Sequence, residues 1–163
     1  MYKEENEKVR KEVLAAAEGL PDELLNRKPA EDEWSPMEVL EHLHLMEAYI
    51  AKNLSRQIAR EESEKAVKKP IQLTVSRMVK VDAPAPLVPT GEFITLSDMK
   101  GRLAESRVFL DSVYDATTVE VLESKSMPHP VFGKVPLIQW FPFIGLHEKR
   151  HLKQLEKTIE KLK

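Results

Sequence analysis

Apolar residues recur every three or four positions in four long stretches of the 163-residue chain. That spacing gathers them on one face of a helix, so each stretch predicts an amphipathic α-helix. The four helices that we expect cover residues 3–17, 35–65, 97–115 and 136–163. Gly19 and Pro21 mark the end of the first helix, Pro70 limits the second, and Pro142 should bend the last.

The start of the second helix carries the most specific signals. Ser35 can cap the helix, Pro36 suits the first helical position, and Glu38 completes a capping box. Trp34 can pack on Val39 and fix the direction in which the chain enters the helix. We therefore expect a helix boundary at this point.

Two segments between the later helices have a different pattern. Residues 69–95 hold four prolines and Gly91, so they cannot form a continuous helix, and a loop of this length is often functional. Residues 118–123 could form a short strand, whereas residues 127–135, with two prolines and a glycine, predict a second loop. The core contacts expected from the third helix are Met99, Leu103, Val108, Leu110 and Val113.

Composition favours one helical domain over residues 1–163. Hydrophobic residues make up 42% of the chain, charged residues 32%, and there are only five glycines. We expect an all-α fold, an antiparallel four-helix bundle with long loops after its second and third helices. No run approaches the roughly 20 apolar residues that span a bilayer, and the start has no signal region, so we expect a cytoplasmic protein without membrane contact.

Charge and cysteine content exclude several functions. The net charge of −2 provides no basic stripe, so we expect no nucleic-acid partner. The absence of cysteine excludes disulfides, thiolate zinc fingers and a cysteine nucleophile. Histidine or carboxylate would therefore have to hold any bound metal.

The pair His147 and His151 is the best functional lead, because two imidazoles four residues apart on a helix can bind one metal ion. On the second helix, His42 lies about 70° from the centre of the apolar stripe and His44 about 130°. His42 should thus face the bundle interior and His44 the solvent. Two neighbouring helices could bring His42 to the pair and leave a coordination position open for water or substrate.

A less specific explanation stays open. A histidine beside an apolar stripe is usually a packed or half-exposed residue, and a His-x-x-x-His pair arises by chance in many helices. Spacing alone therefore does not assign a metal site. We expect His129, between Pro128 and Pro130, to belong to the loop and not to the site.

Residues 147–151 also spell H-E-x-x-H, in which two zinc ligands flank the general base of a metalloprotease. Those enzymes usually take their third ligand from downstream, yet only twelve residues follow His151, so we do not adopt that interpretation. Glu148 lies near the centre of the apolar stripe. It is either a catalytic base that acts on metal-bound water or an exposed residue on an irregular turn after Pro142.

These motifs resemble those of the DinB-like superfamily, and the resemblance spans nearly the whole chain. Its most specific parts are the run W-S-P-x-E-x-L-x-H at residues 34–42 and the final H-x-x-x-H-x-x-Q at residues 147–154. The resemblance implies a four-helix bundle of the DinB/YfiT-like type. It also implies a divalent metal ion, most often nickel or zinc, held by His42, His147 and His151, and a homodimer. It does not imply DNA binding.

The activities of characterised relatives in that family diverge. They include thiol S-transferases that use bacillithiol or mycothiol, a thiol-dependent isomerase and proteins assigned as metal-dependent hydrolases. The resemblance thus implies a metal-dependent thiol S-transferase or hydrolase that activates a thiol or water to attack a small-molecule substrate, with a low-molecular-weight thiol as a possible cofactor. The alternative is a non-catalytic, dimeric module that binds a metal or ligand, because Glu148 is the sole acid–base candidate.

Further residues are candidates for the surroundings of the metal. Gln154, one turn beyond His151, could orient that histidine or could be a surface amide. Arg77 or Lys80 in the proline-rich segment could contact an anionic cofactor. The aromatic residues that could line an apolar mouth, or else belong to the core, are Tyr49, Trp140 and Phe141.

Overall fold

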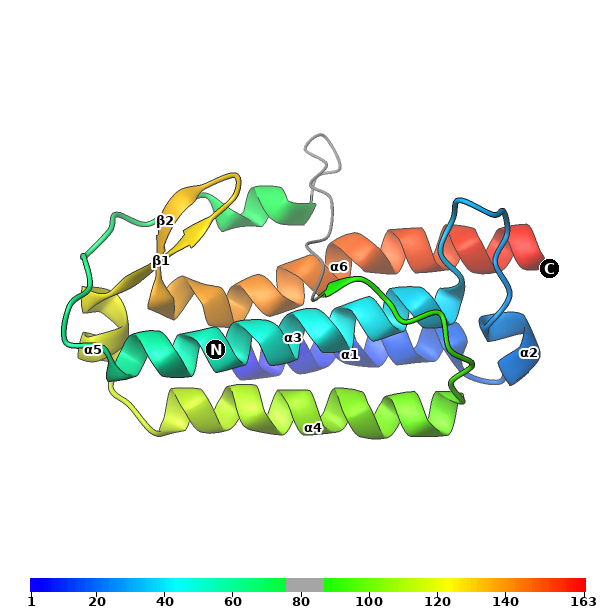
Figure 1. The fold of residues 1–163 in the computed structure, drawn as a ribbon, viewed down its shortest axis with the longest axis horizontal. Coiled ribbons are helices and arrows are strands. Elements are labelled where there is room, and N and C mark those ends of the chain that lie inside the picture. Colours follow the sequence, from blue (N-terminus) through cyan, green and yellow to red (C-terminus); the bar gives the residue numbers. More distant parts are fainter. Residues whose placement is uncertain (76–86) are drawn as a thin grey trace.

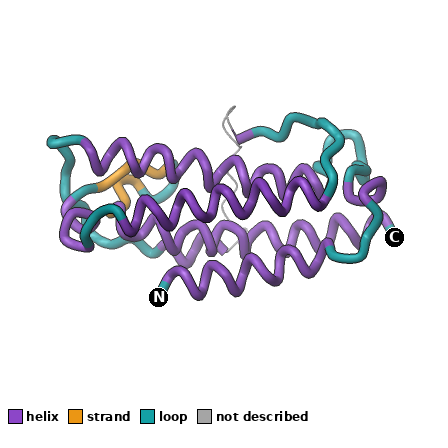
Figure 2. Tube along the Cα trace, turned by 90° about the horizontal axis from the view of Figure 1, so that it is seen from below, coloured by secondary structure: helices purple, strands orange, loops and turns teal. Residues whose placement is uncertain are grey.

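The computed structural model describes residues 1–75 and 87–163. Four long helices lie side by side and form its body (Figures 1 and 2). These helices are α1 (Tyr2–Ala17), α3 (Pro36–Ala59), α4 (Leu96–Asp115) and α6 (Leu137–Leu162). The shorter elements are α2 (Asp22–Leu25), the 3₁₀ helix η1 (Ile71–Val75), α5 (Val119–Ser124), β1 (Ser126–His129) and β2 (Gly133–Pro136). The prediction of a mainly helical protein is confirmed.

Contacts along α1 fix its direction relative to α4. The Tyr2 hydroxyl, at the start of α1, donates a hydrogen bond of 2.8 Å to Asp111 near the end of α4. Arg10, two turns later in α1, donates one of 3.0 Å to the carbonyl of Leu103, earlier in α4. The two helices are therefore antiparallel.

The same helix runs parallel to α6. The Asn6 side chain donates to the carbonyl of Phe141 at 2.9 Å, and Arg10 donates to Glu148 at 2.7 Å, so later residues of one helix meet later residues of the other. Figure 1 shows that α3 and α4 also run in one direction, because the chain leaves α3 at one end of the bundle and enters α4 at the other. We expected every pair of neighbouring helices to be antiparallel. The structure instead has two parallel pairs, α1 with α6 and α3 with α4.

The predicted start of the second long helix is confirmed. Ser35 Oγ accepts a hydrogen bond from the Glu38 amide, the Ser35 amide donates to Glu38 Oε1, both at 3.0 Å, and Pro36 is the first residue of α3. The end of α3 differs from the prediction, because the helix stops at Ala59 and does not continue to residue 65. Arg60 adopts an extended conformation instead.

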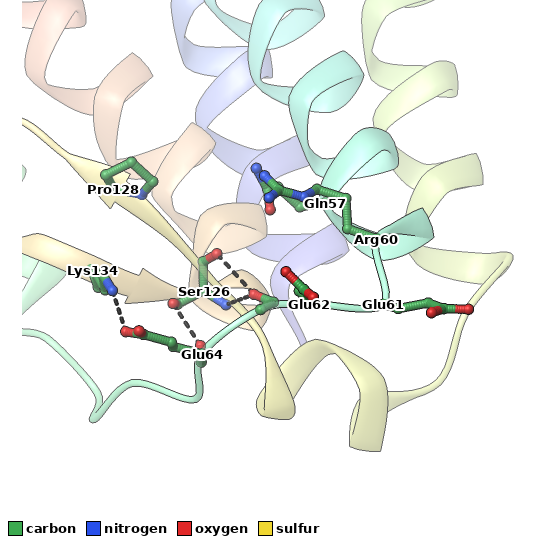
Figure 3. Close-up of a pocket in the computed structure, with 9 residues that line it drawn as sticks. Gln57, Arg60, Glu61, Glu62, Glu64, Ser126, Pro128 and Lys134 are labelled. Atoms are coloured by element: carbon green, nitrogen blue, oxygen red, sulfur yellow. Dashed lines mark hydrogen bonds and ion pairs between the residues drawn. The ribbon is translucent and has the colours of Figure 1, made fainter.

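The charged segment after α3 runs to the β1–β2 hairpin. Ser126 Oγ donates a hydrogen bond of 2.7 Å to the carbonyl of Glu64, and Lys134 forms an ion pair with the Glu64 carboxylate (Figure 3). Tertiary hydrogen bonds from the hairpin thus replace the helical bonds that we expected for residues 60–65. A polar hollow of about 520 Å³ lies between this segment and the hairpin, and its lining includes Gln57 and Arg60.

Residues 118–136 differ most from the prediction. Residues 118–123 were expected as a strand, but Thr118 accepts a hydrogen bond of 3.2 Å from the Val121 amide and caps the short helix α5. Residues 127–135 were expected as a loop, but they lie in an antiparallel hairpin in which Met127 pairs with Val135. Gly133, at a φ of +74°, opens β2 in a conformation that glycine tolerates best.

The interior contains two apolar clusters, one toward each end of the bundle. One lies under the hairpin and includes Leu54, Leu110 and the fully buried Phe141. The other includes Leu40, Leu103 and Leu155 toward the far end. Val108 was predicted to lie in the core, but it is 69% exposed because the buried stripe of α4 passes through residues 103, 107 and 110.

No helix among the described residues is long and apolar enough to cross a membrane.

Candidate metal centre

The fold brings three histidines together between α3 and α6. One ring nitrogen from each of His42, His147 and His151 lies within 4.8 Å of the others. The Nε2 atoms of His42 and His147 are 3.3 Å apart. His147 and His151 are on adjacent turns of α6, and the early part of α3 that carries His42 packs against those turns.

Hydrogen bonds fix the orientation of two of these rings. His42 Nδ1 lies 2.9 Å from the carbonyl oxygen of Leu87, and His151 Nδ1 lies 2.7 Å from Oε1 of Gln154. Because those oxygens accept, each Nδ1 carries the proton and each Nε2 keeps its lone pair. Metal-binding histidines are usually anchored in this way through the nitrogen that does not bind the metal.

Burial affects the charge of two of these rings. It lowers the pKa of the His42 imidazole, and it lowers that of His147 much further, because His151 and His42 also disfavour a positive charge there. His42 and His147 are therefore held in the neutral form, which is the form that binds metal ions.

The donor set fits a divalent transition metal. Three imidazole nitrogens suit zinc or nickel. Two nitrogens bound at about 2.0–2.1 Å to one tetrahedral zinc ion are about 3.4 Å apart, which is close to the separation of His42 Nε2 and His147 Nε2. Three protein ligands also leave at least one coordination position for another molecule.

A pocket of about 560 Å³ opens beside the three histidines. It lies between α3, α6, η1 and the hairpin. Its apolar walls include Met46, Ile50, Leu73, Phe132 and Phe143. Two predicted mouth residues, Tyr49 and Trp140, line this pocket, whereas Phe141 is fully buried and belongs to the core.

The other two histidines differ from the predictions. His44 is half-buried and not solvent-facing, and its buried Nδ1 has no hydrogen-bond partner among the described residues. It does not line the pocket. His129 was expected in a loop away from the site, but it ends β1 and lines the pocket. Arg77 and Lys80, the candidates for contact with an anionic cofactor, lie outside the described residues.

Glu148 lies in a buried ion-pair network that the sequence reading missed. Its oxygens accept hydrogen bonds from Arg10 Nε at 2.7 Å and from Arg107 Nη2 at 2.5 Å. Both arginines also bind Glu47, at 2.9 Å and 2.6 Å. Glu148 is only 1% exposed, so the prediction of an exposed residue on an irregular turn is wrong.

This environment gives Glu148 a structural task. Burial raises the pKa of its carboxyl group, and the two guanidinium groups oppose that shift. Both carboxylate oxygens are occupied by arginine donors, and the pocket lining contains the histidines on either side of Glu148 but not Glu148 itself. The geometry therefore offers no support for a general base at this position.

The sequence did contain a signal for this network. Arg10, Glu47 and Arg107 each lie three residues before a buried apolar residue of their own helix, namely Val13, Ile50 and Leu110. Charged residues in such positions must be paired, because an isolated charge is rarely buried. Two arginines and two glutamates on four apolar stripes could thus have been matched before the structure was known.

Comparison with known proteins agrees with this fold. A structure described as TT2238, a four-helix bundle protein, has a TM-score of 0.64 and 22% identity, with 96% of each chain covered. An uncharacterised protein of Bacillus subtilis (strain 168), YuaE, is 37% identical over 153 residues, which are 94% of each chain. The sequence profile of the DinB superfamily matches residues 5–155. The family resemblance noted in the sequence is confirmed, and the chain belongs to the DinB superfamily.

Proposed function

We propose that this protein is a divalent-metal-dependent enzyme, a thiol S-transferase or a hydrolase, whose metal is held by His42, His147 and His151. The observation that carries the proposal is the convergence of three imidazole nitrogens within 4.8 Å at the wall of an apolar pocket. Nickel or zinc suits this donor set. When bound, such an ion supplies Lewis acidity that lowers the pKa of a coordinated thiol or water.

The protein residues have separate tasks in this proposal. Leu87 and Gln154 hold the rings of His42 and His151, so that the Nε2 atoms converge. The apolar walls of the pocket bind the body of the substrate and keep water from it. The network of Glu148 with Arg10 and Arg107 holds α6 against α1 and α4.

The dimensions of the pocket support a small-molecule substrate. A volume of about 560 Å³ falls within the usual range for small-molecule sites, about 300–1,000 Å³. That space is sufficient for a low-molecular-weight thiol together with a small electrophile. A metal-activated thiolate needs no separate general base, which agrees with the engagement of Glu148 elsewhere.

The experiment that tests the proposal combines metal analysis with assays of thiol transfer. We expect about one nickel or zinc ion per chain in the wild-type protein and none in the His151→Ala variant. His44→Ala is the matched control, because His44 is also a helical histidine but lies outside the pocket. Unchanged metal content in His151→Ala would overturn the ligand assignment.

The second candidate function is a non-catalytic module in which the same three histidines sequester a metal. Metal-loaded protein should be offered several low-molecular-weight thiols with an electrophile such as 1-chloro-2,4-dinitrobenzene, and ester substrates for hydrolysis. Bound metal without turnover of any substrate would favour the module.

The homodimer implied by the family resemblance stays part of the proposal, and light scattering during size-exclusion chromatography would test it.

A further inference from the structure

His129 faces the same pocket as the three converging histidines, although it comes from a different part of the fold. It ends β1, and the hairpin places it over the first two turns of α6. Its ring centroid is 5.6 Å from that of Trp140, 5.2 Å from that of Phe143 and 4.9 Å from that of Phe132. Three aromatic side chains thus hold the imidazole at the pocket wall.

The turn of the hairpin determines which nitrogen of His129 carries the proton. Nδ1 lies 3.0 Å from the amide nitrogen of Val131 and 3.3 Å from that of Phe132, and both amides donate to it. An amide N–H can only donate, so Nδ1 must present its lone pair. The neutral ring then carries its proton on Nε2, on the side of the ring away from the turn.

The Nε2–H group has no hydrogen-bond acceptor among the described residues. The ring is half-buried, and burial lowers the pKa of His129, which keeps it neutral. An oriented N–H donor therefore remains at the wall of a pocket whose surface is mainly apolar. Small-molecule sites commonly combine apolar walls with a few such groups, which fix the orientation of a ligand.

We propose that the Nε2–H of His129 binds an oxygen acceptor of the ligand, and that the pocket selects small aromatic molecules carrying a carbonyl or similar group. Phe132, Trp140 and Phe143 would pack on the aromatic body. Binding of such a ligand depends only on the pocket. That the ligand is the substrate of the enzyme rests on the proposed function. His129 would then orient the electrophile beside the three histidines.

One substitution separates the hydrogen bond to the ligand from the hydrogen bonds within the turn. In His129→Asn, the side-chain oxygen can take the place of Nδ1 and accept from Val131 and Phe132, but the shorter amide places no N–H where the Nε2–H of His129 stood. His129→Phe keeps an aromatic ring among the three neighbours and also lacks the donor. His44→Asn is the matched control, because it makes the same replacement outside the pocket.

The ligand probes are 2-acetylnaphthalene, which has a carbonyl acceptor, and 2-ethylnaphthalene, which has nearly the same shape without one. Binding to metal-free and zinc-loaded protein is followed by the fluorescence of the two tryptophans, both of which line the pocket. His129→Asn should weaken binding of 2-acetylnaphthalene about fivefold and leave that of 2-ethylnaphthalene within about twofold. His44→Asn should change neither.

Equal weakening of both probes in His129→Asn would show that His129 only supports the pocket wall. Failure of 2-acetylnaphthalene to bind the wild-type protein would overturn the ligand class. A nitrogen-15 NMR spectrum of the wild-type imidazole that placed the proton on Nδ1 would overturn the donor assignment without any variant. These measurements need neither bound metal nor turnover. Their failure is therefore distinguishable from failure of the proposed function, which metal analysis and thiol-transfer assays test.

Discussion

Arg10 Nε on α1 lies 2.7 Å from Oε1 of Glu148 on α6. Glu148 is the residue directly after His147. Arg107 on α4 binds the other oxygen of Glu148, and both arginines also bind Glu47 on α3. One buried network therefore joins the four long helices beside the converging histidines. Its residues lie between the two apolar clusters, so the charged layer also fixes how the helices align along the bundle.

Glu148→Gln tests the structural task of this network. The substitution keeps the size of the side chain but leaves two buried guanidinium groups with only one carboxylate, so we expect a loss of about 3 kcal/mol in the free energy of unfolding. Urea denaturation would measure it. Glu64→Gln, which removes an exposed ion pair with Lys134, is the control and should leave the unfolding midpoint nearly unchanged.

The same variant also addresses catalysis. A Glu148→Gln protein that keeps its stability and bound metal but loses turnover would show that Glu148 is a general base after all. Loss of stability, with activity retained in the folded fraction, would assign the residue to the ion-pair network alone.

Metal removal should destabilise the protein. An ion that binds only the folded state stabilises it by about 2.7 kcal/mol at a free concentration one hundred times its dissociation constant. We therefore expect nickel or zinc to raise the thermal unfolding midpoint of the wild-type protein and a chelator to reverse that rise. His42→Ala should show no metal-dependent shift, whereas His44→Ala should behave as the wild type. A normal shift in His42→Ala would remove His42 from the proposed ligand set.

The sequence predicted the features that depend on neighbouring residues. The capping box of Ser35 and Glu38 marked the start of α3 because all its hydrogen bonds lie within four residues. The helical wheel correctly placed His42 toward the bundle interior, because its angle to the apolar stripe is a property of one helix. It gave the wrong environment to His44, which is half-buried, since burial also depends on the neighbouring helix α4.

The features that the sequence did not predict depend on distant contacts. The parallel arrangement of α1 and α6 depends on the path of the whole chain between them, and no local sequence pattern predicts it. The segment after α3 is held by contacts of Glu64 with Ser126 and Lys134, more than 60 residues away. The place of His129 at the pocket depends on pairing of β1 with β2. The prolines in that segment had led us to predict a loop there.

Gln154→Leu should weaken metal binding without abolishing it. The leucine has a similar size but cannot accept the hydrogen bond from His151 Nδ1, so the ring loses its anchor. Loss of such outer hydrogen bonds typically costs about 10- to 100-fold in metal affinity. Competition with a chromophoric chelator would measure this change. Lys153→Ala, at the exposed position before Gln154, is the control, and equal affinities of both variants would contradict the orienting task.

The close approach of α1 to α6 at Gly145 gives the last prediction. A Cβ atom added there would lie 2.2 Å from Oδ1 of Asn6, whose amide is held by its hydrogen bond to the carbonyl of Phe141. Gly145→Ala should thus destabilise the protein by about 1–3 kcal/mol through overpacking, although alanine is the better helix former by about 1 kcal/mol. Gly101→Ala on α4 is the control, because a Cβ atom there meets nothing within 4 Å, and it should stabilise.

The double variant Asn6→Ala with Gly145→Ala identifies the cause. Without the Asn6 side chain the added methyl group no longer meets an oxygen, so Gly145→Ala should cost much less in an Asn6→Ala background than in the wild type. Thermal or urea denaturation of the four proteins in this cycle would give the coupling between the two positions. Additive effects would contradict the contact, because two residues that collide cannot contribute independently to the free energy of unfolding.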